Sequence, residues 1–418
     1  MKKQILLLVF LGFQLAYAQV YKEIIPPKNI KTVQLFNPQT NDQTPLIRFG
    51  TEYFVLSFDD LNQGFKEYNY KIEHYNADWT PSGIFQSEYL NGYGSDYFRD
   101  YAYSFNTYQA YTHYSLQFPN RDMSVKLPGN YVIKVYTDNE KKPVFTKRFG
   151  VYDPQNVSVG IKEERGIGTG DLNQRISVVA SSGQLNLTET PDGAKLFVMK
   201  NGNWEDNLTI DKPSFLTPAQ LTYKNNDYLF EGGSEYLWFD TKNLEVAAMT
   251  TEQIFKGETD GLYHIVLRAD SPGRNVGYFD NSDVNGAFYI RNVKVPDQNR
   301  SGIEADYAWV HFALDNFDEE GGNKELYVLG AFNNWQPTAE YRLKYSDANY
   351  WEVAVLLKQG YYNYQYGVYD KKTGKMNYSE INGSFWQAEN QYQALFYYRP
   401  WGVRYDLLMG FGSVNSRN

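Results

Sequence analysis

The sequence predicts an all-β protein with three consecutive immunoglobulin-like β-sandwiches after a cleaved signal peptide. Three observations support this class: apolar and polar residues alternate along short segments, turn-forming residues recur at short intervals, and tyrosine is abundant. The chain has 38 tyrosines among 418 residues. Because aromatic side chains favour pleated, half-buried surfaces, this composition indicates sheet before helix.

The first residues have the form of an export signal. Lys2 and Lys3 make the first three residues basic, residues 5–13 are largely apolar, and small residues stand at positions 16 and 18. Signal peptidase requires this arrangement, so we predict cleavage between Ala18 and Gln19. An uncleaved anchor is the alternative, although the apolar run is too short for a membrane span.

Three blocks follow the signal peptide at 1–18. The first block, 19–154, contains alternating segments at 53–58, 68–75 and 131–136, and it ends with a predicted strand at 146–152 followed by Asp153-Pro154. The second block, 155–302, contains shorter strand-like segments and ends in a polar stretch at 296–302. The third block, 303–405, opens with the apolar segment 305–314. Residues 406–418 are predicted to be a loose tail.

Composition excludes several classes of function. The chain has no cysteine, which removes disulfides, thiol nucleophiles and cysteine-bound zinc. A net charge of −9 argues against nucleic acid, for which a basic surface is expected. No later segment reaches 18 consecutive apolar residues, so the predicted mature protein is soluble or peripheral to a membrane.

The motifs of catalysis and metal binding are weak or missing. The four histidines, at 74, 113, 264 and 311, show no metal-binding spacing, and His74 and His311 fall inside predicted strands. The segment 281–286 resembles the start of a calcium loop, but Asn285-Gly286 is also what a tight turn requires, and we interpret it as a turn. The glycines of 166–170 lack the following Lys-Ser/Thr of a phosphate-binding loop. We therefore predict no enzyme, cofactor, metal or small-molecule substrate; a hydrolase with an unrecognised acid pair is the least favoured alternative.

The third block resembles the glycogen-binding family of immunoglobulin-like modules. The resemblance rests on residues 325–335, which end in Phe332-Asn333-Asn334-Trp335, and on segments 350–353 and 359–366. It implies a sandwich in which Asn334 and Trp335 contact sugar. A lysine near Gln365 and a second tryptophan near 371–374, both typical of that family, are absent. The alternative interpretation is that Trp335 packs a turn, and a glycan-binding module is therefore the second candidate function.

A broader resemblance covers nearly the whole chain after the signal peptide. The residues that carry it lie in segments 79–84, 88–93, 103–107, 111–120 and 128–131. They resemble the plug proteins of the bacterial type IX secretion system, although Pro128 stands where serine is more common. The resemblance implies a periplasmic protein that closes the periplasmic mouth of the outer-membrane translocon barrel, to which it attaches peripherally.

A tyrosine-rich stretch in the first block is the candidate partner interface. Tyrosine rings provide contact area at a low cost in conformational entropy, and they are enriched among the residues that dominate binding energy. The alternative is that this stretch simply covers the first core. The candidate interface residues are Tyr89, Tyr93, Tyr97, Tyr101, Tyr103 and Tyr108.

Overall fold

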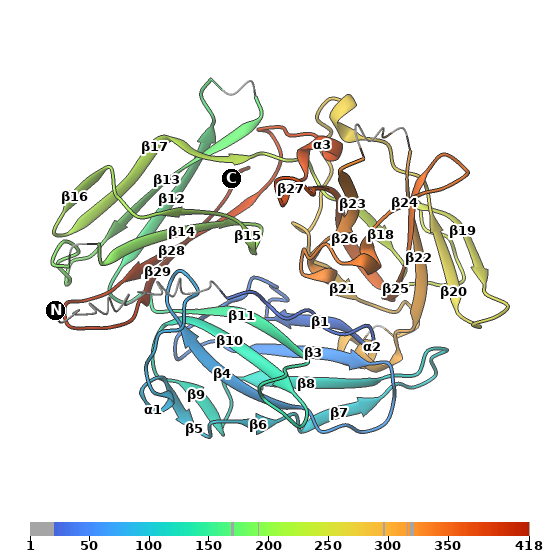
Figure 1. Ribbon diagram of the computed structural model, residues 1–418, viewed down its shortest axis with the longest axis horizontal. Helices are drawn as coiled ribbons and strands as arrows, with labels where there is room; N and C mark the ends of the chain where they lie inside the picture. The colour runs from blue at the N-terminus through green and yellow to red at the C-terminus, as the bar shows by residue number, and fades with distance from the viewer. Residues whose placement is uncertain are drawn as a thin grey trace, which may run out of the picture.

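The computed structural model describes residues 21–168, 171–190, 192–295, 297–315, 317 and 322–417. Nearly all regular structure in this part of the chain is strand, so the predicted all-β class is confirmed. The strands form three sandwiches, which lie as three lobes around a common centre (Figure 1). The predicted cleavage site at Ala18 and Gln19 lies outside the described residues.

The N-terminal sandwich is the lower lobe of Figure 1 and is formed by one continuous stretch of chain. Its sheets have the orders β1-β3-β8-β7 and β2-β11-β10-β4-β6, and β5 and β9 form a separate pair. Only β2 and β11 pair in parallel among these strands. The elements are β1 (Ile30–Phe36), β2 (Leu46–Arg48), β3 (Phe54–Asp60), β4 (Asn69–Tyr75), α1 (Gln86–Tyr89), β5 (Leu90–Gly92), β6 (Asp96–Tyr97), β7 (Asp100–Tyr103), β8 (Thr112–Phe118), β9 (Met123–Val125), β10 (Gly129–Tyr136) and β11 (Phe145–Tyr152).

Alternation along the strands explains the core of this sandwich. In β4, Tyr70 and Ile72 are buried, whereas Lys71 and Glu73 between them are partly exposed. Successive side chains of a strand point to opposite faces, so this spacing places one apolar row between the two sheets. Fully burying each such side chain contributes about 1.5–3 kcal/mol. Many of the buried rings are tyrosines, which accounts for much of the unusual composition.

The middle sandwich combines two distant parts of the chain. Its sheets have the orders β12-β13-β17-β16 and β15-β14-β28-β29. Figure 1 shows the red C-terminal strands lying beside the green strands of the upper left lobe. The elements are β12 (Ser158–Arg165), β13 (Asn173–Ser181), β14 (Ala194–Lys200), β15 (Asn203–Ile210), β16 (Phe215–Thr217), β17 (Gln220–Glu231), β28 (Gln391–Tyr398) and β29 (Leu407–Asn415).

The inserted sandwich lies between β17 and β28 in the sequence and forms the upper right lobe. One sheet has the order β19-β20-β22-β25-β24, and the other is built around the long strand β26. Its elements are β18 (Leu237–Asp240), β19 (Thr251–Lys256), β20 (Tyr263–Leu267), η1 (Gly273–Asn275), β21 (Phe288–Ile290), α2 (Gln298–Glu304), β22 (Tyr307–Leu314), β23 (Lys324–Leu329), η2 (Ala331–Asn333), η3 (Ala339–Tyr341), β24 (Lys344–Tyr345), β25 (Trp351–Lys358), β26 (Gly360–Asp370), β27 (Lys375–Asn377) and α3 (Ser379–Asn382). No helix in the described ranges is long and apolar enough to cross a membrane.

The strand pairing differs from the predicted division at 155–302 and 303–405. Strand β18, predicted to belong to the second block, pairs with β26 of the third. Strand β28, predicted to belong to the third block, pairs with β14 along seven residues. Local alternation identifies strands but carries no information about which distant strand is the partner, so consecutive blocks were the wrong division.

The predicted tail at 406–418 is also wrong. Residues 407–415 form β29, which pairs with β28, and Leu408 is completely buried. Gly410 and Gly412 of this strand lie against β12. A Cβ atom added to Gly412 would stand 2.4 Å from the carbonyl oxygen of Val159, so glycine permits this close approach of two backbones.

Candidate functional site

The six predicted interface tyrosines do not share one environment. Tyr89 is buried in the core of the N-terminal sandwich, where its hydroxyl donates to the carbonyl of Ile72 at 3.3 Å. It therefore cannot contact a partner, and its place in the candidate interface is wrong. It ends α1, whose single turn directs this ring inward. The remaining five, Tyr93, Tyr97, Tyr101, Tyr103 and Tyr108, are exposed by 43–66%.

Strand β7 presents the most compact group of exposed rings. Tyr101 and Tyr103 are two residues apart and thus lie on the same face of the strand, with ring centroids 6.0 Å apart. Phe65 packs 4.9 Å from Tyr101 and is 55% exposed. We call Phe65, Tyr101 and Tyr103 the β7 aromatic patch. Its strand forms the edge of its sheet, so both the rings and one backbone edge face outward.

The other exposed tyrosines lie outside this patch. The guanidinium of Arg99 lies 4.4 Å from the ring of Tyr97, and the main-chain carbonyl of Tyr93 accepts from Gln86 of α1 at 3.5 Å. Tyr108 contacts the inserted sandwich: its ring lies 3.8 Å from the ammonium of Lys256. The sequence stretch therefore separates into one compact patch and three rings that lie outside it.

The residues of the glycan alternative are mostly covered. Trp335 is only 8% exposed, and its ring packs 5.6 Å from Tyr236. A Cβ atom added to Gly286 would stand 2.6 Å from the same indole, so the Asn285-Gly286 turn lies directly against it. Asn334 has a left-handed backbone and accepts from Lys147 of the N-terminal sandwich at 2.5 Å. Trp335 thus packs within the inserted sandwich, whereas Asn334 belongs to the contact with the N-terminal sandwich.

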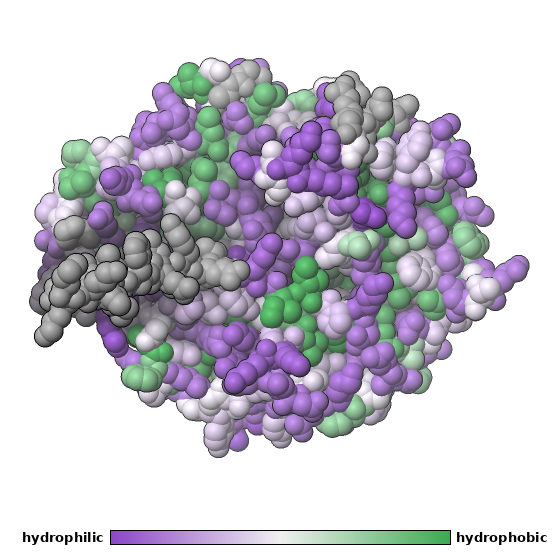
Figure 2. All heavy atoms as spheres, viewed as in Figure 1, coloured by the Kyte–Doolittle hydropathy of each residue, from purple (hydrophilic) through white to green (hydrophobic). Residues whose placement is uncertain are grey.

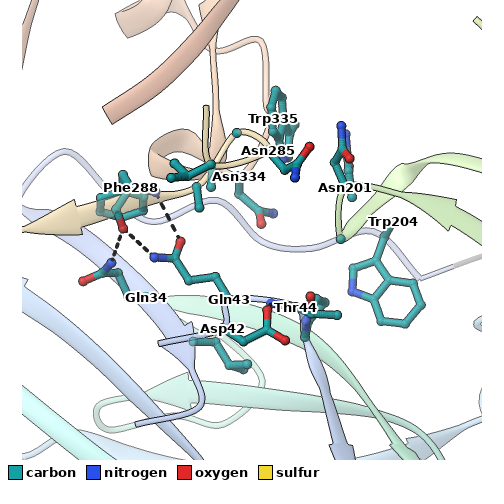
Figure 3. Close-up of a pocket in the computed structure, with 18 of the residues that line it drawn as sticks. Gln34, Asp42, Gln43, Thr44, Asn201, Trp204, Asn285, Phe288, Asn334 and Trp335 are labelled. Atoms are coloured by element: carbon teal, nitrogen blue, oxygen red, sulfur yellow. Dashed lines mark hydrogen bonds between the residues drawn. The ribbon is translucent and has the colours of Figure 1, made fainter. Parts of the chain in front are cut away.

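A cavity of about 320 Å³ lies where the three sandwiches meet. Figure 3 shows Gln34, Gln43 and Thr44 of the N-terminal sandwich facing Asn334 of the inserted sandwich and Trp204 of the middle sandwich. The amide groups of Gln34 and Gln43 both donate to the carbonyl of Phe288, at 3.2 and 2.5 Å. Side-chain amides therefore hold two of the lobes together along one wall.

A buried ion pair joins the N-terminal and inserted sandwiches. Asp59, which is completely buried, accepts from Lys358 at 2.6 Å and from Tyr307 at 2.7 Å, and its other oxygen lies 2.6 Å from Nδ1 of His113. Burial opposes the ionisation of Asp59, but the charge of Lys358 and the bond to His113 hold its pKa below the ordinary value. A charge that is this well paired stabilises a particular orientation of the two lobes.

Sequence reasoning missed this network. Lys358 follows the apolar residues of β25 and is itself 1% exposed. A lysine at the end of an apolar strand is a weak sign of a buried partner. Two adjacent aspartates are more often solvated loop charges, but Asp59 and Asp60 lie at the end of β3, where both are buried.

Histidines and carboxylates form few other clusters. His264 and His311 lie 2.9 Å apart through their ring nitrogens, a contact that their sequence positions gave no reason to expect. His74 lies inside β4 as predicted and is buried, but neither ring nitrogen has a hydrogen-bond partner. Burial lowers the pKa of His74 to about 4. Within the part of the chain that the structure describes, no three His, Asp or Glu side chains are grouped so that they could hold a metal ion.

These observations define a protein of three packed β-sandwiches with an exposed aromatic patch on an edge strand. Residues 30–153, the N-terminal sandwich, match the family model of the type 9 secretion system plug protein 1st domain. The structure also resembles the crystal structure of a hypothetical protein from Parabacteroides merdae, with 30% sequence identity and a TM-score of 0.88. The match covers 95% of this chain and 100% of that protein's chain. The chain belongs to the family of that protein, and its N-terminal sandwich is the part that matches the plug protein first domain.

Two further solved structures resemble the chain only weakly. Trypsin-activated alpha-2-macroglobulin from Escherichia coli gives 11% identity and a TM-score of 0.20, and a Salmonella alpha-2-macroglobulin mutant gives 9% and 0.17. The matches cover 94% of this chain but 24% of each of those chains. They carry no argument about fold or function. The comparison with curated proteins gave no match.

Proposed function

We propose that this protein is a non-enzymatic periplasmic plug subunit of the type IX secretion system. In this proposal it seals the periplasmic opening of the outer-membrane translocon barrel while no substrate passes. It associates with the outer membrane through that barrel. The proposal extends the family assignment of the N-terminal sandwich, which is a type 9 secretion system plug protein domain.

The observation that supports a docking role is the position of the β7 aromatic patch. It lies on the same sandwich that matches the plug domain, and its three rings are each about half exposed. Exposed aromatic rings close together are uncommon on proteins that act alone, and they commonly mark the centre of a protein interface. The network around Asp59 fixes this sandwich against the inserted one, so a partner would meet a rigid body.

Affinity copurification tests this proposal. The tagged protein is purified from envelopes in mild detergent, and the recovered proteins are identified. We expect the wild-type chain to recover an outer-membrane barrel and the Tyr101→Ser/Tyr103→Ser variant to recover at least tenfold less. Phe279→Ala removes a ring that is 76% exposed on the inserted sandwich and is the matched control. Recovery of no barrel by the wild type would refute the proposal.

The glycan alternative has less support. Sugar stacking requires an open ring face, whereas Trp335 is covered by Tyr236 and by the turn at Gly286. We expect the protein not to be retained on glycogen or starch. Retention that is lost in Trp335→Ala would support the alternative instead.

A further inference from the structure

The rings of the β7 aromatic patch lie beside the outermost strand of one sheet of the N-terminal sandwich. This sheet has the order β1-β3-β8-β7, and no other described strand pairs with the outer side of β7. The pairing of β7 with β8 runs from Asp100 to Tyr103 without a register shift. Asp100, Tyr101 and Tyr103 are all exposed, so this side of the strand is open to a partner.

The hydrogen bond just beyond β7 shows which of its backbone groups are unpaired. Ser104 donates its main-chain N–H to the carbonyl of Tyr111 at 2.9 Å, and this pair continues the register of β7 and β8. In an antiparallel ladder, hydrogen-bonded residue pairs alternate with pairs that are not hydrogen-bonded. Ala102, two residues before Ser104, is therefore bonded to β8, whereas the N–H and C=O groups of Tyr101 and Tyr103 point away from it. Within the described residues, no hydrogen bond outside the ladder uses these four groups.

The opposite edge of the same sheet is protected in two ways that β7 lacks. The register of β1 shifts between Lys31 and Gln34, which marks a bulge, and the inserted sandwich lies against this strand. Gln34 donates its side-chain amide to the carbonyl of Phe288 at 3.2 Å, and Lys31 pairs with Glu340. Bulges and covering elements are common means of blocking an edge strand. A regular and uncovered edge such as that of β7 is a template for a further strand.

Contact with the rings alone gives a partner little apolar surface on this lobe. On the face shown in Figure 2, hydrophilic side chains cover most of the N-terminal sandwich, and the hydrophobic ones form small, separate patches. When a strand is added to a sheet edge, main-chain hydrogen bonds provide affinity and alternate side chains provide specificity. The two tyrosines of β7 offer both, because they carry the open backbone groups as well as the exposed rings.

We propose that an extended segment of the barrel pairs with the outer edge of β7 and continues its sheet as a fifth strand. This inference rests on the proposed function, since it names how that partner is held. Tyr101 and Tyr103 each donate one main-chain hydrogen bond to the segment and accept one from it. Their backbone groups are about 6.8 Å apart along the strand, which is the repeat that an extended segment presents.

The side chains of β7 indicate the composition of that segment. Tyr101, Tyr103 and Phe65 border one face of the added strand and favour apolar residues at alternate positions. Asp100 points to the opposite face, is exposed, and has no ionic partner among the described residues. A lysine or arginine on that face of the segment complements it. A second copy of this chain does not supply this cation, because its own β7 contains no basic residue.

A proline at position 103 tests backbone pairing separately from the ring. Tyr103→Pro and Tyr103→Ser both remove the ring, but only proline also removes the main-chain N–H. That N–H points away from β8, so the proline breaks no hydrogen bond of the existing sheet. In the copurification described above, we expect Tyr103→Pro to recover at least tenfold less barrel than Tyr103→Ser. The melting temperature of each variant shows whether it is folded.

Hydrogen exchange of the wild type gives a second measurement that needs no substitution. In the free protein, we expect the amides of Tyr101 and Tyr103 to exchange rapidly and that of Ala102 to exchange slowly. In the copurified complex, exchange at Tyr101 and Tyr103 should be at least tenfold slower. Mass spectrometry with fragmentation to single residues measures these rates.

Equal recovery by folded Tyr103→Pro and Tyr103→Ser, or unchanged exchange at Tyr101 and Tyr103 in the complex, would overturn the inference while the proposed function stands. A wild-type dimer that Tyr103→Pro makes monomeric in light scattering would also overturn it, because the added strand would then come from a second copy. If the wild type recovers no barrel, the proposed function fails and this inference fails with it.

Discussion

The inserted sandwich meets its two neighbours through opposite electrostatics. Its contact with the N-terminal sandwich is built on the ionised pair of Lys358 and Asp59. Its contact with the middle sandwich contains two buried carboxyl groups, Glu235 and Asp283, in an acidic environment that also includes Glu389. The guanidinium of Arg417 lies 2.7 Å from Glu235, but it lowers the pKa of Glu235 by less than burial raises it. One contact therefore requires charge, and the other is stabilised when charge is removed.

The pKa values of these groups give the contacts opposite responses to pH. Burial raises the pKa of both Glu235 and Asp283 to about 7. Their folded forms bind protons more tightly than the unfolded chain, so their contribution to stability is complete below about pH 4 and is lost as pH rises through 7. The pKa of Asp59 is lowered, so its contribution is present above its ordinary value of 3.8 and is lost only in acid. Between pH 5 and 8 the contribution of Asp59 should therefore stay constant, while the contributions of Glu235 and Asp283 decline.

The largest expected effect on stability comes from breaking the charged contact between Lys358 and Asp59. Lys358→Met leaves Asp59 buried without its main countercharge, and we expect a loss of about 3–5 kcal/mol in the free energy of unfolding. Urea denaturation at pH 7 measures it. Lys66→Met is the matched control: Lys66 is 43% exposed, and the buried Asp60 that it contacts keeps hydrogen bonds from Asn29 and Tyr68, so we expect a smaller loss.

A double variant sharpens this prediction. Asp59→Asn/Lys358→Met removes both charges, so no unpaired ion remains, and we expect it to recover more than half of the loss. Equal stability of the single and double variants would show that lost packing, and not the buried charge, causes the effect.

A smaller loss is expected where Trp335 lies against the turn at Gly286. Gly286 has φ +83°, and an added Cβ would overlap the indole, so Gly286→Ala should cost about 2–3 kcal/mol. Gly233→Ala is the control, because Gly233 has φ +71° with nothing within 4 Å and tests backbone strain alone, at about 1 kcal/mol. Equal losses for Gly286→Ala and Gly233→Ala would show that the Trp335 indole moves aside without a measurable cost in stability.

The acidic contact should respond in the opposite direction. Glu235→Gln removes a carboxyl that must ionise while buried, so we expect a gain of about 1–2 kcal/mol at pH 8 and little change at pH 5. Urea denaturation at the two pH values checks this. A variant less stable than wild type at pH 8 would show that the bond to Arg417 outweighs burial.

The smallest effect on stability is expected at the β7 aromatic patch. Tyr101 and Tyr103 are 43% and 48% exposed, so Tyr101→Ser/Tyr103→Ser should change the free energy of unfolding by less than about 1 kcal/mol. Thermal unfolding of the purified variant measures this. A larger loss would show that these rings stabilise the sandwich. Reduced barrel recovery by the variant would then be explained by unfolding and not by loss of a binding surface.

The difference between the lobes also explains what the sequence could predict. The N-terminal sandwich is continuous in sequence, and its alternating segments at 68–75 and 131–136 correspond to β4 and β10. The other two sandwiches interleave, because β28 and β29 return to β14 after the insertion. Period-2 alternation predicts a strand and its buried face, but pairing across some 190 residues depends on the whole fold.

The same limit applies to the site. Tyr101 and Tyr103 were predictable as candidates because tyrosine is unusually frequent in that stretch, whereas Phe65 joins them only through the fold. Tyr89 illustrates the opposite error, since composition cannot tell which side of the sheet a ring occupies. Asp59 and Lys358 are 299 residues apart, and only the packing of two sandwiches brings them into contact.

Outer-membrane permeability tests the sealing claim most directly. A strain that lacks the protein is complemented with wild type, with Lys66→Met or with Tyr101→Ser/Tyr103→Ser, and uptake of a large solute normally excluded by the outer membrane is measured. The account predicts that loss of the protein raises uptake, that wild type and Lys66→Met restore the barrier, and that the tyrosine variant does not. Uptake that is the same with and without the protein would contradict it.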